Sequence, residues 1–269
     1  MPVFLDEIVG TTRARVAEAK RSTDMRELAL RAEKHSPRAF RRSLENASAN
    51  GVAIIAELKK ASPSKGIIRA NLHVAGIAQQ FEKAGAAALS VLTEESYFQG
   101  SLTNLIEASA ATSLPCLRKD FIVDKFQLLE ARANRADAIL LIVAALTDAD
   151  LSDLYKEARS LGLDVLCEVH DELELGRALA AGCDIIGVNS RDLRTFHVDI
   201  DVPLRIARKM PDSVLRVAES GIRGGEDINR LRAAGFQAFL IGESFMRADV
   251  PGNALKALLA DARGNAAGL

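Results

Sequence analysis

The chain has no tryptophan, only two tyrosines and three cysteines in 269 residues. So few aromatic side chains disfavour stacking platforms for single-stranded nucleic acid or for sugars. Cys116, Cys167 and Cys183 form neither a CxxC pair nor a Cys/His cluster, so the sequence predicts free thiols and neither a disulfide framework nor a zinc site. Because free thiols are typical of a reducing compartment, we expect a cytoplasmic protein.

The chain also lacks a dominant charge and long apolar runs. Its 35 basic and 36 acidic residues leave a net charge of −1, which gives no bulk electrostatic reason to bind nucleic acid or an anionic membrane. No apolar run approaches the ~20 residues needed to cross a bilayer. Nothing indicates an oligomeric interface, which slightly favours a monomer. What the chain does have is 48% hydrophobic residues, enough for a large core.

From residue 52 onward the chain alternates short apolar runs with segments of helical periodicity. The runs are rich in Leu and β-branched residues and begin 20 to 35 residues apart, which leaves room for a loop and a helix after each. Three intervening segments end in alanine followed by glycine, which supplies the left-handed conformation that caps a helix. The runs are 52–58, 87–93, 114–120, 138–143, 164–170, 184–190, 214–220 and 238–243.

Near-continuous apolar strands that alternate with helices predict a parallel sheet covered by helices. With eight strands, closure into a (β/α)8 barrel is the economical arrangement. A doubly wound open sheet is the alternative, but it usually carries a glycine-rich GxGxxG turn after its first strand. Residues 59–66 read KKASPSKG instead, which favours the barrel.

Residues 1–50 precede the first predicted strand and show helical spacing of apolar residues. Phe4, Ile8 and Val16 fit one helix, and Phe40 and Leu44 fit another. The segment is neither Pro/Ser-rich nor low in complexity. We therefore expect one domain over residues 1–269, in which 1–50 form an N-terminal helical extension packed on the barrel or over one of its ends.

Polar side chains follow seven of the eight predicted strands. The βα loops of such barrels converge at the carboxyl ends of the strands, where the chemistry lies. Glu57 and Lys59 are two residues apart, so they share a face and meet either as a functional pair or as a structural ion pair. The same alternation turns Cys167, which precedes Glu168, outward toward the helices. The other strand-end candidates are Thr93, Glu94, Lys119, Asp120, His170, Asn189, Arg191, Glu219, Ser220, Gly242 and Glu243.

Glycine-rich stretches after the last two predicted strands indicate an anion site. Residues 219–225 read ESGIRGG, and residues 241–244 read IGES. Glycine permits close backbone approach, and amides at a helix N-terminus bind phosphate without a large net charge. The loops after strands seven and eight are the usual phosphate site of such barrels. With Lys59 and Ser62 from the first loop nearby, we expect a phosphorylated small molecule as ligand.

The four histidines are scattered along the chain, without HExxH or a ligand spacing, so the sequence predicts no metal site. His170 is expected to be a solvated loop residue. The absence of a GxSxG motif disfavours covalent acyl transfer.

Several motifs resemble those of the indole-3-glycerol phosphate synthase family, in order and at matching strands. The most specific is IIAELKKASPSKG over 54–66, in which Leu58 and Lys60 stand where the family usually has isoleucine and arginine. The resemblance covers essentially the whole chain and implies a (β/α)8 barrel with an N-terminal helical extension. The other similar stretches are LDEIV (5–9), LRKDFI (117–122), EVH (168–170), GVNSRDL (187–193) and AESGI (218–222).

The resemblance implies ring closure of 1-(2-carboxyphenylamino)-1-deoxyribulose 5-phosphate, with loss of carbon dioxide and then water, to indole-3-glycerol phosphate in tryptophan biosynthesis. Lys119 would be the general acid of ring closure and Glu168 its partner in proton transfer. Glu57 and Lys59 would complete the charged cluster, and the two lysines could exchange roles in dehydration. No metal or organic cofactor is needed, because restoring the aromatic ring drives decarboxylation.

By the same resemblance, the remaining site residues orient or bind the substrate. Asn189, Glu219 and Ser220 would orient it at the catalytic centre. Arg191 would bind its anionic groups. The phosphate would be held by Ser62, Gly221, Gly242 and the backbone of Glu243.

Two other functions stay open at this point. Phosphoribosylanthranilate isomerase, another phosphate-binding barrel enzyme, would be expected to show a cysteine and aspartate acid–base pair, and it leaves the extension unexplained. A non-catalytic barrel that binds sugar phosphates is disfavoured because Glu57, Lys59, Lys119 and Glu168 are present together.

Overall fold

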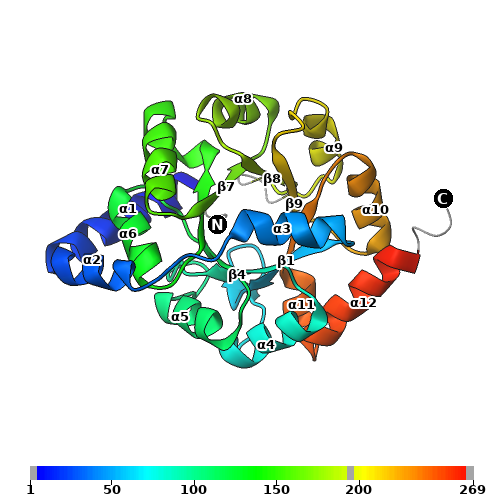
Figure 1. Ribbon diagram of the computed structural model, residues 1–269, viewed down its shortest axis with the longest axis horizontal. Helices are drawn as coiled ribbons and strands as arrows, with labels where there is room; N and C mark the ends of the chain where they lie inside the picture. The colour runs from blue at the N-terminus through cyan, green and yellow to red at the C-terminus, as the bar shows by residue number, and fades with distance from the viewer. Residues whose placement is uncertain (1–4, 193–196, 265–269) are drawn as a thin grey trace.

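The computed structural model describes residues 5–192 and 197–264. Eight parallel strands close into a barrel in the order β1-β10-β9-β8-β7-β6-β5-β4, which confirms the predicted (β/α)8 architecture (Figure 1). Each predicted apolar run contains one strand. These are β1 (Ala53–Leu58), β4 (Ala88–Leu92), β5 (Cys116–Lys119), β6 (Ala138–Ile142), β7 (Asp164–Val169), β8 (Ile185–Asn189), β9 (Leu215–Glu219) and β10 (Ala238–Ile241).

Helices surround the barrel and connect each strand to the next (Figure 1). The loop after β1 contains a small antiparallel hairpin of β2 (Ala61–Ser62) and β3 (Gly66–Ile67), which the sequence did not predict. A 3-10 turn, η1 (Val143–Ala145), follows β6. The outer helices are α4 (Val74–Ala84), α5 (Leu102–Ala111), α6 (Lys125–Ala133), α7 (Asp148–Ser160), α8 (Glu172–Ala180), α9 (Asp201–Ala207), α10 (Gly225–Ala233), α11 (Glu243–Arg247) and α12 (Pro251–Gly264).

Local sequence accounts for several helix ends. Gly85 is the C-cap of α4 with φ of 96°, and Gly182 and Gly235 follow α8 and α10 with φ of 85° and 92°. These left-handed conformations confirm the predicted glycine caps. Asp124 begins α6 with a capping box, in which the Gln127 side chain accepts a hydrogen bond from the Asp124 amide. The helix therefore starts at a fixed place directly after the loop that follows β5.

Alternation along each strand divides its side chains between the barrel interior and the helix layer. Ile55, Leu117 and Leu166 pack with one another in the interior, whereas Ile54 and Leu141 belong to the core beneath the helices. The next interior positions toward the carboxyl ends of these strands carry charge, at Glu57, Lys119 and Glu168. The apolar barrel core thus ends in a layer of ionisable groups.

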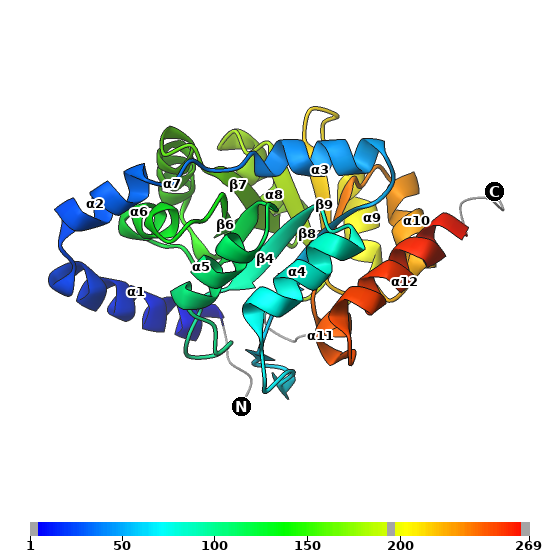
Figure 2. The same ribbon diagram turned by 60° about the horizontal axis from the view of Figure 1, so that its bottom comes forward.

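The N-terminal extension consists of α1 (Leu5–Ser22), α2 (Met25–Glu33) and α3 (Phe40–Ala49), which confirms helical structure for the described part of 1–50. Phe4, which was assigned to its first helix, lies outside the described residues. Figure 2 shows α1 and α3 at opposite ends of the barrel. Phe40 and Leu44 of α3 are fully buried against residues at the starts of the strands, such as Ala53. The extension therefore closes the amino-terminal end of the barrel and reaches its carboxyl end.

Asp137, which directly precedes β6, ties the extension to the barrel. Its carboxylate accepts hydrogen bonds from the Arg38 backbone amide at 2.7 Å and from the Arg38 guanidinium at 2.6 and 2.9 Å. His35 Nε2 lies 3.0 Å from the same carboxylate, and the Cys116 amide donates to it at 2.6 Å. Every one of these contacts is buried or half-buried, so one side chain organises this end of the molecule.

The expectation of three free thiols was wrong for two of them. Cys167 points outward from β7, as alternation predicted, and forms a disulfide with Cys183, whose Cα lies 6.4 Å away. Cys116 is a free, buried thiol. A separation of 16 residues carries no spacing signal for a disulfide, and the pairing arises because the chain returns to the neighbouring strand, β8. Among the described helices, none is long and apolar enough to span a membrane.

Candidate active site

A cavity of about 580 Å³ opens at the carboxyl ends of the barrel strands. It brings together the twelve residues to which the family resemblance assigns site roles, from six different βα connections, although their individual roles stay predictions. These residues are Glu57, Lys59, Ser62, Lys119, Glu168, Asn189, Arg191, Glu219, Ser220, Gly221, Gly242 and Glu243. The strand-end candidates Thr93, Glu94 and His170 do not line the cavity.

Two Lys–Glu pairs form the charged floor of this cavity. Lys59, the residue directly after β1, donates from Nζ to Oε1 of Glu57 in β1 at 2.6 Å. Lys119 Nζ, at the end of β5, donates to Glu168 Oε2 of β7 at 3.2 Å. Lys119 Nζ also lies 3.8 Å from Glu219 Oε2 of β9. The alternation argument correctly predicted that Glu57 and Lys59 share a face.

Burial and mutual charge set the protonation of the Lys119–Glu168 pair. Burial alone would lower the pKa of Lys119, but the charges of Glu168, Glu219 and Glu57 outweigh it and raise that pKa. Burial alone would raise the pKa of Glu168, but the charge of the Lys119 ammonium and the nearby His170 ring hold it well below its usual range. The resting pair is therefore an ammonium beside a carboxylate.

Glu219 differs from the other carboxylates of the cluster. Burial and then the charge of Glu168 raise its pKa, against the opposing charge of Lys119. Its Oε1 is buried and has no hydrogen-bond partner. Gly187 of β8 leaves room for this carboxyl group, because a Cβ at position 187 would collide with Glu219 Oε1. Glu219 thus holds a proton more readily than Glu168 does.

The loops after β9 and β10 line the end of the cavity where the sequence predicts an anion site. Ser220 and Gly221 adopt left-handed conformations with φ of 63° and 78°, which bend the chain sharply after β9. A Cβ on Gly242 would fall 2.5 Å from Glu57 Oε1, so only glycine fits between β10 and α11. Lys65, Arg223 and Arg247, which the sequence analysis did not single out, also line the cavity and add positive charge there. Arg191 Nη2 lies 3.9 Å from Glu243 Oε2 at the same end.

An apolar wall faces the charged floor, and sequence reasoning missed it. It is built from the start of α1, from β4 and the loop after it, from the loop after β5, and from β6 and β10. A usable signal was present, since Ile8 belongs to the apolar pattern of the extension and Phe121 to the LRKDFI motif. The residues are Leu5, Ile8, Leu92, Phe98, Phe121, Leu140, Ile142 and Leu240.

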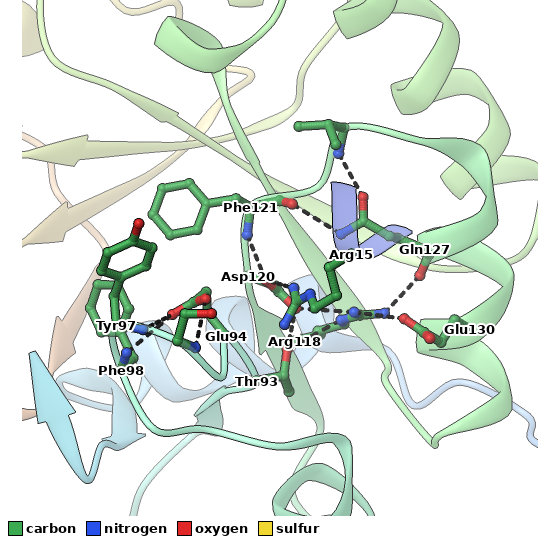
Figure 3. Close-up of polar contacts among 12 residues, drawn as sticks. Arg15, Thr93, Glu94, Tyr97, Phe98, Arg118, Asp120, Phe121, Gln127 and Glu130 are labelled. Atoms are coloured by element: carbon green, nitrogen blue, oxygen red, sulfur yellow. Dashed lines mark hydrogen bonds and ion pairs between the residues drawn. The ribbon is translucent and has the colours of Figure 1, made fainter. Parts of the chain in front are cut away.

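A buried polar network around Asp120 holds the end of β5 in place (Figure 3). Asp120 accepts hydrogen bonds from Thr93 Oγ1 at 2.7 Å and from Arg118 Nη2 at 3.0 Å, and Arg15 of α1 lies 3.3 Å from its other oxygen. Lys119 stands between Arg118 and Asp120 in the chain, so the network determines where its backbone sits. Thr93 and Asp120, two of the strand-end candidates, therefore hold the backbone at the end of β5 in position.

A second part of the network shapes the loop after β4. The buried carboxylate of Glu94 accepts from the backbone amides of Ser96, Tyr97 and Phe98 at 2.7 to 3.1 Å. This arrangement places the Phe98 ring against the Phe121 ring, with centroids 6.2 Å apart (Figure 3). Glu94 is thus also a structural residue, which holds one edge of the apolar wall.

Comparison with known proteins decides the family. The sequence model of the indole-3-glycerol phosphate synthase family matches residues 5–258. The chain belongs to the indole-3-glycerol phosphate synthase family. A protein of that name from Koribacter versatilis (strain Ellin345) is 58% identical over 96% of this chain and 100% of its own length. One from Burkholderia vietnamiensis (strain G4 / LMG 22486) is 50% identical over 95% of this chain and 98% of its own length.

Solved structures confirm the barrel without bearing on the reaction. A 3-hexulose-6-phosphate synthase superposes with a TM-score of 0.64 at 14% identity, over 78% of this chain and 99% of its own. A thiamine phosphate pyrophosphorylase from Pyrococcus furiosus has a TM-score of 0.58 at 15% identity, over 81% of this chain and 98% of its own. At such identities the likeness shows the fold alone.

The structure of this member of the indole-3-glycerol phosphate synthase family also corrects the expectation for His170. His170 is not a solvated loop residue, because its side chain is only 14% exposed and lies between two carboxylates. The sequence signal for it was the same two-residue alternation that paired Glu57 with Lys59, since His170 follows Glu168 by two positions. Leu193, the last residue of the GVNSRDL motif, lies outside the described residues.

Proposed function

We propose that the cavity binds 1-(2-carboxyphenylamino)-1-deoxyribulose 5-phosphate and converts it to indole-3-glycerol phosphate, carbon dioxide and water. One observation carries the proposal. One cavity holds the two Lys–Glu pairs together with the apolar wall and the glycine-rich loops after β9 and β10. This arrangement matches a molecule with an aromatic ring, a phosphate and a ketone between them.

Ring closure needs an acid at the ketone. The ring carbon that bears the carboxylate attacks the ketone carbon, and the ketone oxygen must gain a proton as it becomes an alcohol. Lys119 supplies that proton, because it ends β5 next to Phe121 of the apolar wall and Glu168 holds it as an ammonium. Loss of carbon dioxide then restores the aromatic ring. Glu168 takes part in the accompanying proton transfer.

Dehydration needs both an acid and a base. The hydroxyl group leaves as water when it gains a proton, and the neighbouring carbon must lose one. Glu57 and Lys59 form a ready pair for these two tasks, with 2.6 Å between the ammonium and the carboxylate. The two pairs thus divide the two chemical steps between them.

The remaining cavity residues bind and orient. The backbone of Ser220, Gly221, Gly242 and Glu243 approaches the phosphate closely, in the place where such barrels usually hold one. Ser62 and Arg191 add contacts to the anionic groups. Asn189 and Glu219, at the ends of neighbouring strands, orient the reacting centre.

We also propose a domain organisation and a set of partners for the chain. It acts as one domain, with residues 1–50 as part of that domain, and as a monomer. It needs no cofactor, and it binds neither nucleic acid nor membrane. Support comes from the near-zero net charge and from the way α3 shares the buried core of the barrel. The cytoplasmic location stays a prediction without the support of the thiols, because Cys167 and Cys183 are paired.

Mass spectrometry of quenched reactions tests the proposal. Given the carboxyphenylamino deoxyribulose phosphate, the protein is expected to release carbon dioxide and indole-3-glycerol phosphate in equal amounts, with or without a chelator. Given phosphoribosylanthranilate, it is expected to leave that compound unchanged. Conversion of the second compound alone would favour an isomerase, and binding without turnover would favour a non-catalytic barrel.

A further inference from the structure

His170 bridges two carboxylates at the edge of the proposed catalytic cluster. Its Nε2 lies 3.4 Å from Glu168 Oε1, while the other oxygen of Glu168 accepts from Lys119. Its Nδ1 lies 3.0 Å from Glu174 Oε2 of α8, and its backbone amide donates to that same oxygen at 2.8 Å. Nitrogen bases and carboxylates therefore alternate along the series Lys119, Glu168, His170 and Glu174.

The charges around the ring favour one protonation state of the imidazole. A neutral ring carries one N–H and one lone pair. With the proton on Nδ1, the lone pair of Nε2 would face the Glu168 carboxylate. With the proton on Nε2, the lone pair of Nδ1 would face Glu174. The carboxylates on both sides favour a proton on both nitrogens, so we infer an imidazolium whose Nε2 faces Glu168 as an ion pair at 3.4 Å, without a hydrogen bond.

We propose that His170 is a positioning residue for the reaction, which acts through Glu168. Held by Glu174, the imidazolium keeps Glu168 ionised and turned toward Lys119, so that Lys119 is a fully charged acid aimed into the cavity. This role rests on the proposed function of Lys119 and Glu168. Glu174, from a helix outside the barrel, contributes to the site by fixing the ring.

The surroundings of the ring support this role. Glu168 faces it from β7 and Glu174 from α8, and beyond Glu168 stand Lys119 of β5, Asn189 of β8 and Glu219 of β9. Burial would lower the pKa of His170, but the carboxylates of Glu168 and Glu174 beside it raise it to about 10. The imidazolium consequently persists through the neutral range.

Paired substitutions separate positioning from packing. His170→Asn removes the donor that faces Glu168, whereas His170→Gln places an amide nitrogen near the position of Nε2 without a charge. We expect kcat of His170→Asn to fall about tenfold or more with little change in KM. The acid limb of its kcat–pH profile should move up by about one pH unit, because Glu168 loses a nearby cation. His170→Gln should recover most of kcat but keep the shifted limb.

Glu174→Gln tests the outer half of the series with His170 in place. The pKa of His170 should fall from about 10, so kcat should decline on the alkaline side at a lower pH than in the wild type. NMR of 15N-labelled histidine, with His170→Asn for assignment, should show an imidazolium at pH 7 in the wild type. Matched controls are Glu172→Gln on the same helix and His73→Gln, both exposed side chains, which should leave rate and profile unchanged.

The outcomes separate this inference from the proposed function. A wild-type protein that makes no product contradicts the proposed function. An active wild type in which His170 is neutral at pH 7 contradicts the positioning role alone. So does a His170→Asn variant whose kcat falls without a shift of the acid limb, because loss of packing would produce that result.

Discussion

Lys119 and Lys59 stand on different strands, and each has its own carboxylate at hydrogen-bond distance. The two Lys–Glu pairs can thus serve different steps of the proposed reaction, because they lie at different places in the cavity. Glu219 adds a carboxyl group whose raised pKa sets it apart from Glu168, although both are buried. Residue-scale tests must therefore address the pairs separately.

Lys119→Ala is expected to reduce kcat by about 10²- to 10⁴-fold, the usual cost of a lost acid or base, while substrate still binds. Steady-state kinetics and a direct binding titration check both halves of this prediction. Turnover at the wild-type rate would remove Lys119 from the mechanism.

Lys59→Ala is expected to spare ring closure and to slow dehydration. Quenched samples should then contain the decarboxylated, still hydroxylated intermediate, detectable by mass spectrometry as product plus one water. Lys119→Ala should not accumulate this species, because it fails before carbon dioxide is lost. The reverse pattern would show that the two lysines have exchanged roles.

At the same scale, the sequence predicted which residues face the cavity better than it predicted their partners. Alternation along a strand determines the face of Glu57, Lys59 and Cys167, and each lies where that rule put it. Partners on other elements carry no such signal. The disulfide of Cys167 and the contact of His170 with Glu174 depend on how β7, α8 and β8 pack together.

Asp137 shows how one side chain connects elements, since it joins the segment between α2 and α3 to the starts of β5 and β6. Asp137→Asn should destabilise the protein by about 3–5 kcal/mol, as expected when one partner of a buried ion pair is removed. Thermal and urea unfolding check this value. Asp153→Asn, at an exposed position of α7, is the matched control and should change stability little.

The pH dependence of stability follows from the same carboxylate. Burial would raise the pKa of Asp137, but hydrogen bonds from His35 and Arg38 lower it below its ordinary value. A lowered pKa means that its contribution to stability is present above the ordinary range near pH 4 and is lost as pH falls through the folded value. The wild type should therefore lose more stability than Asp137→Asn between about pH 5 and pH 2. Equal losses in the two proteins would contradict this account.

Elements with strong periodicity were predictable from sequence, and short ones were not. Every barrel strand lies within a predicted run because a strand buried on both faces is continuously apolar. The β2–β3 hairpin has two-residue strands, too short for any pattern to show. The extension was expected to pack on the barrel, but α1 and α3 at opposite ends follow from tertiary contacts alone.

For the whole molecule, the shared core of α3 and the barrel predicts one cooperative unfolding transition. Calorimetric and van't Hoff enthalpies should agree, as they do for a single domain without populated intermediates. A separate early transition of residues 1–50 would contradict the proposal of one domain. The length of 269 residues thus corresponds to a barrel of usual size plus an extension that both closes one end and lines the mouth of the other.

The absence of tryptophan makes the central claim directly measurable, because the protein has no indole emission of its own. Purified protein should be mixed with 1-(2-carboxyphenylamino)-1-deoxyribulose 5-phosphate and excited in the indole absorption band. The account predicts indole fluorescence that rises with time in proportion to enzyme and is lost in Lys119→Ala. No rise at micromolar wild-type enzyme would contradict it.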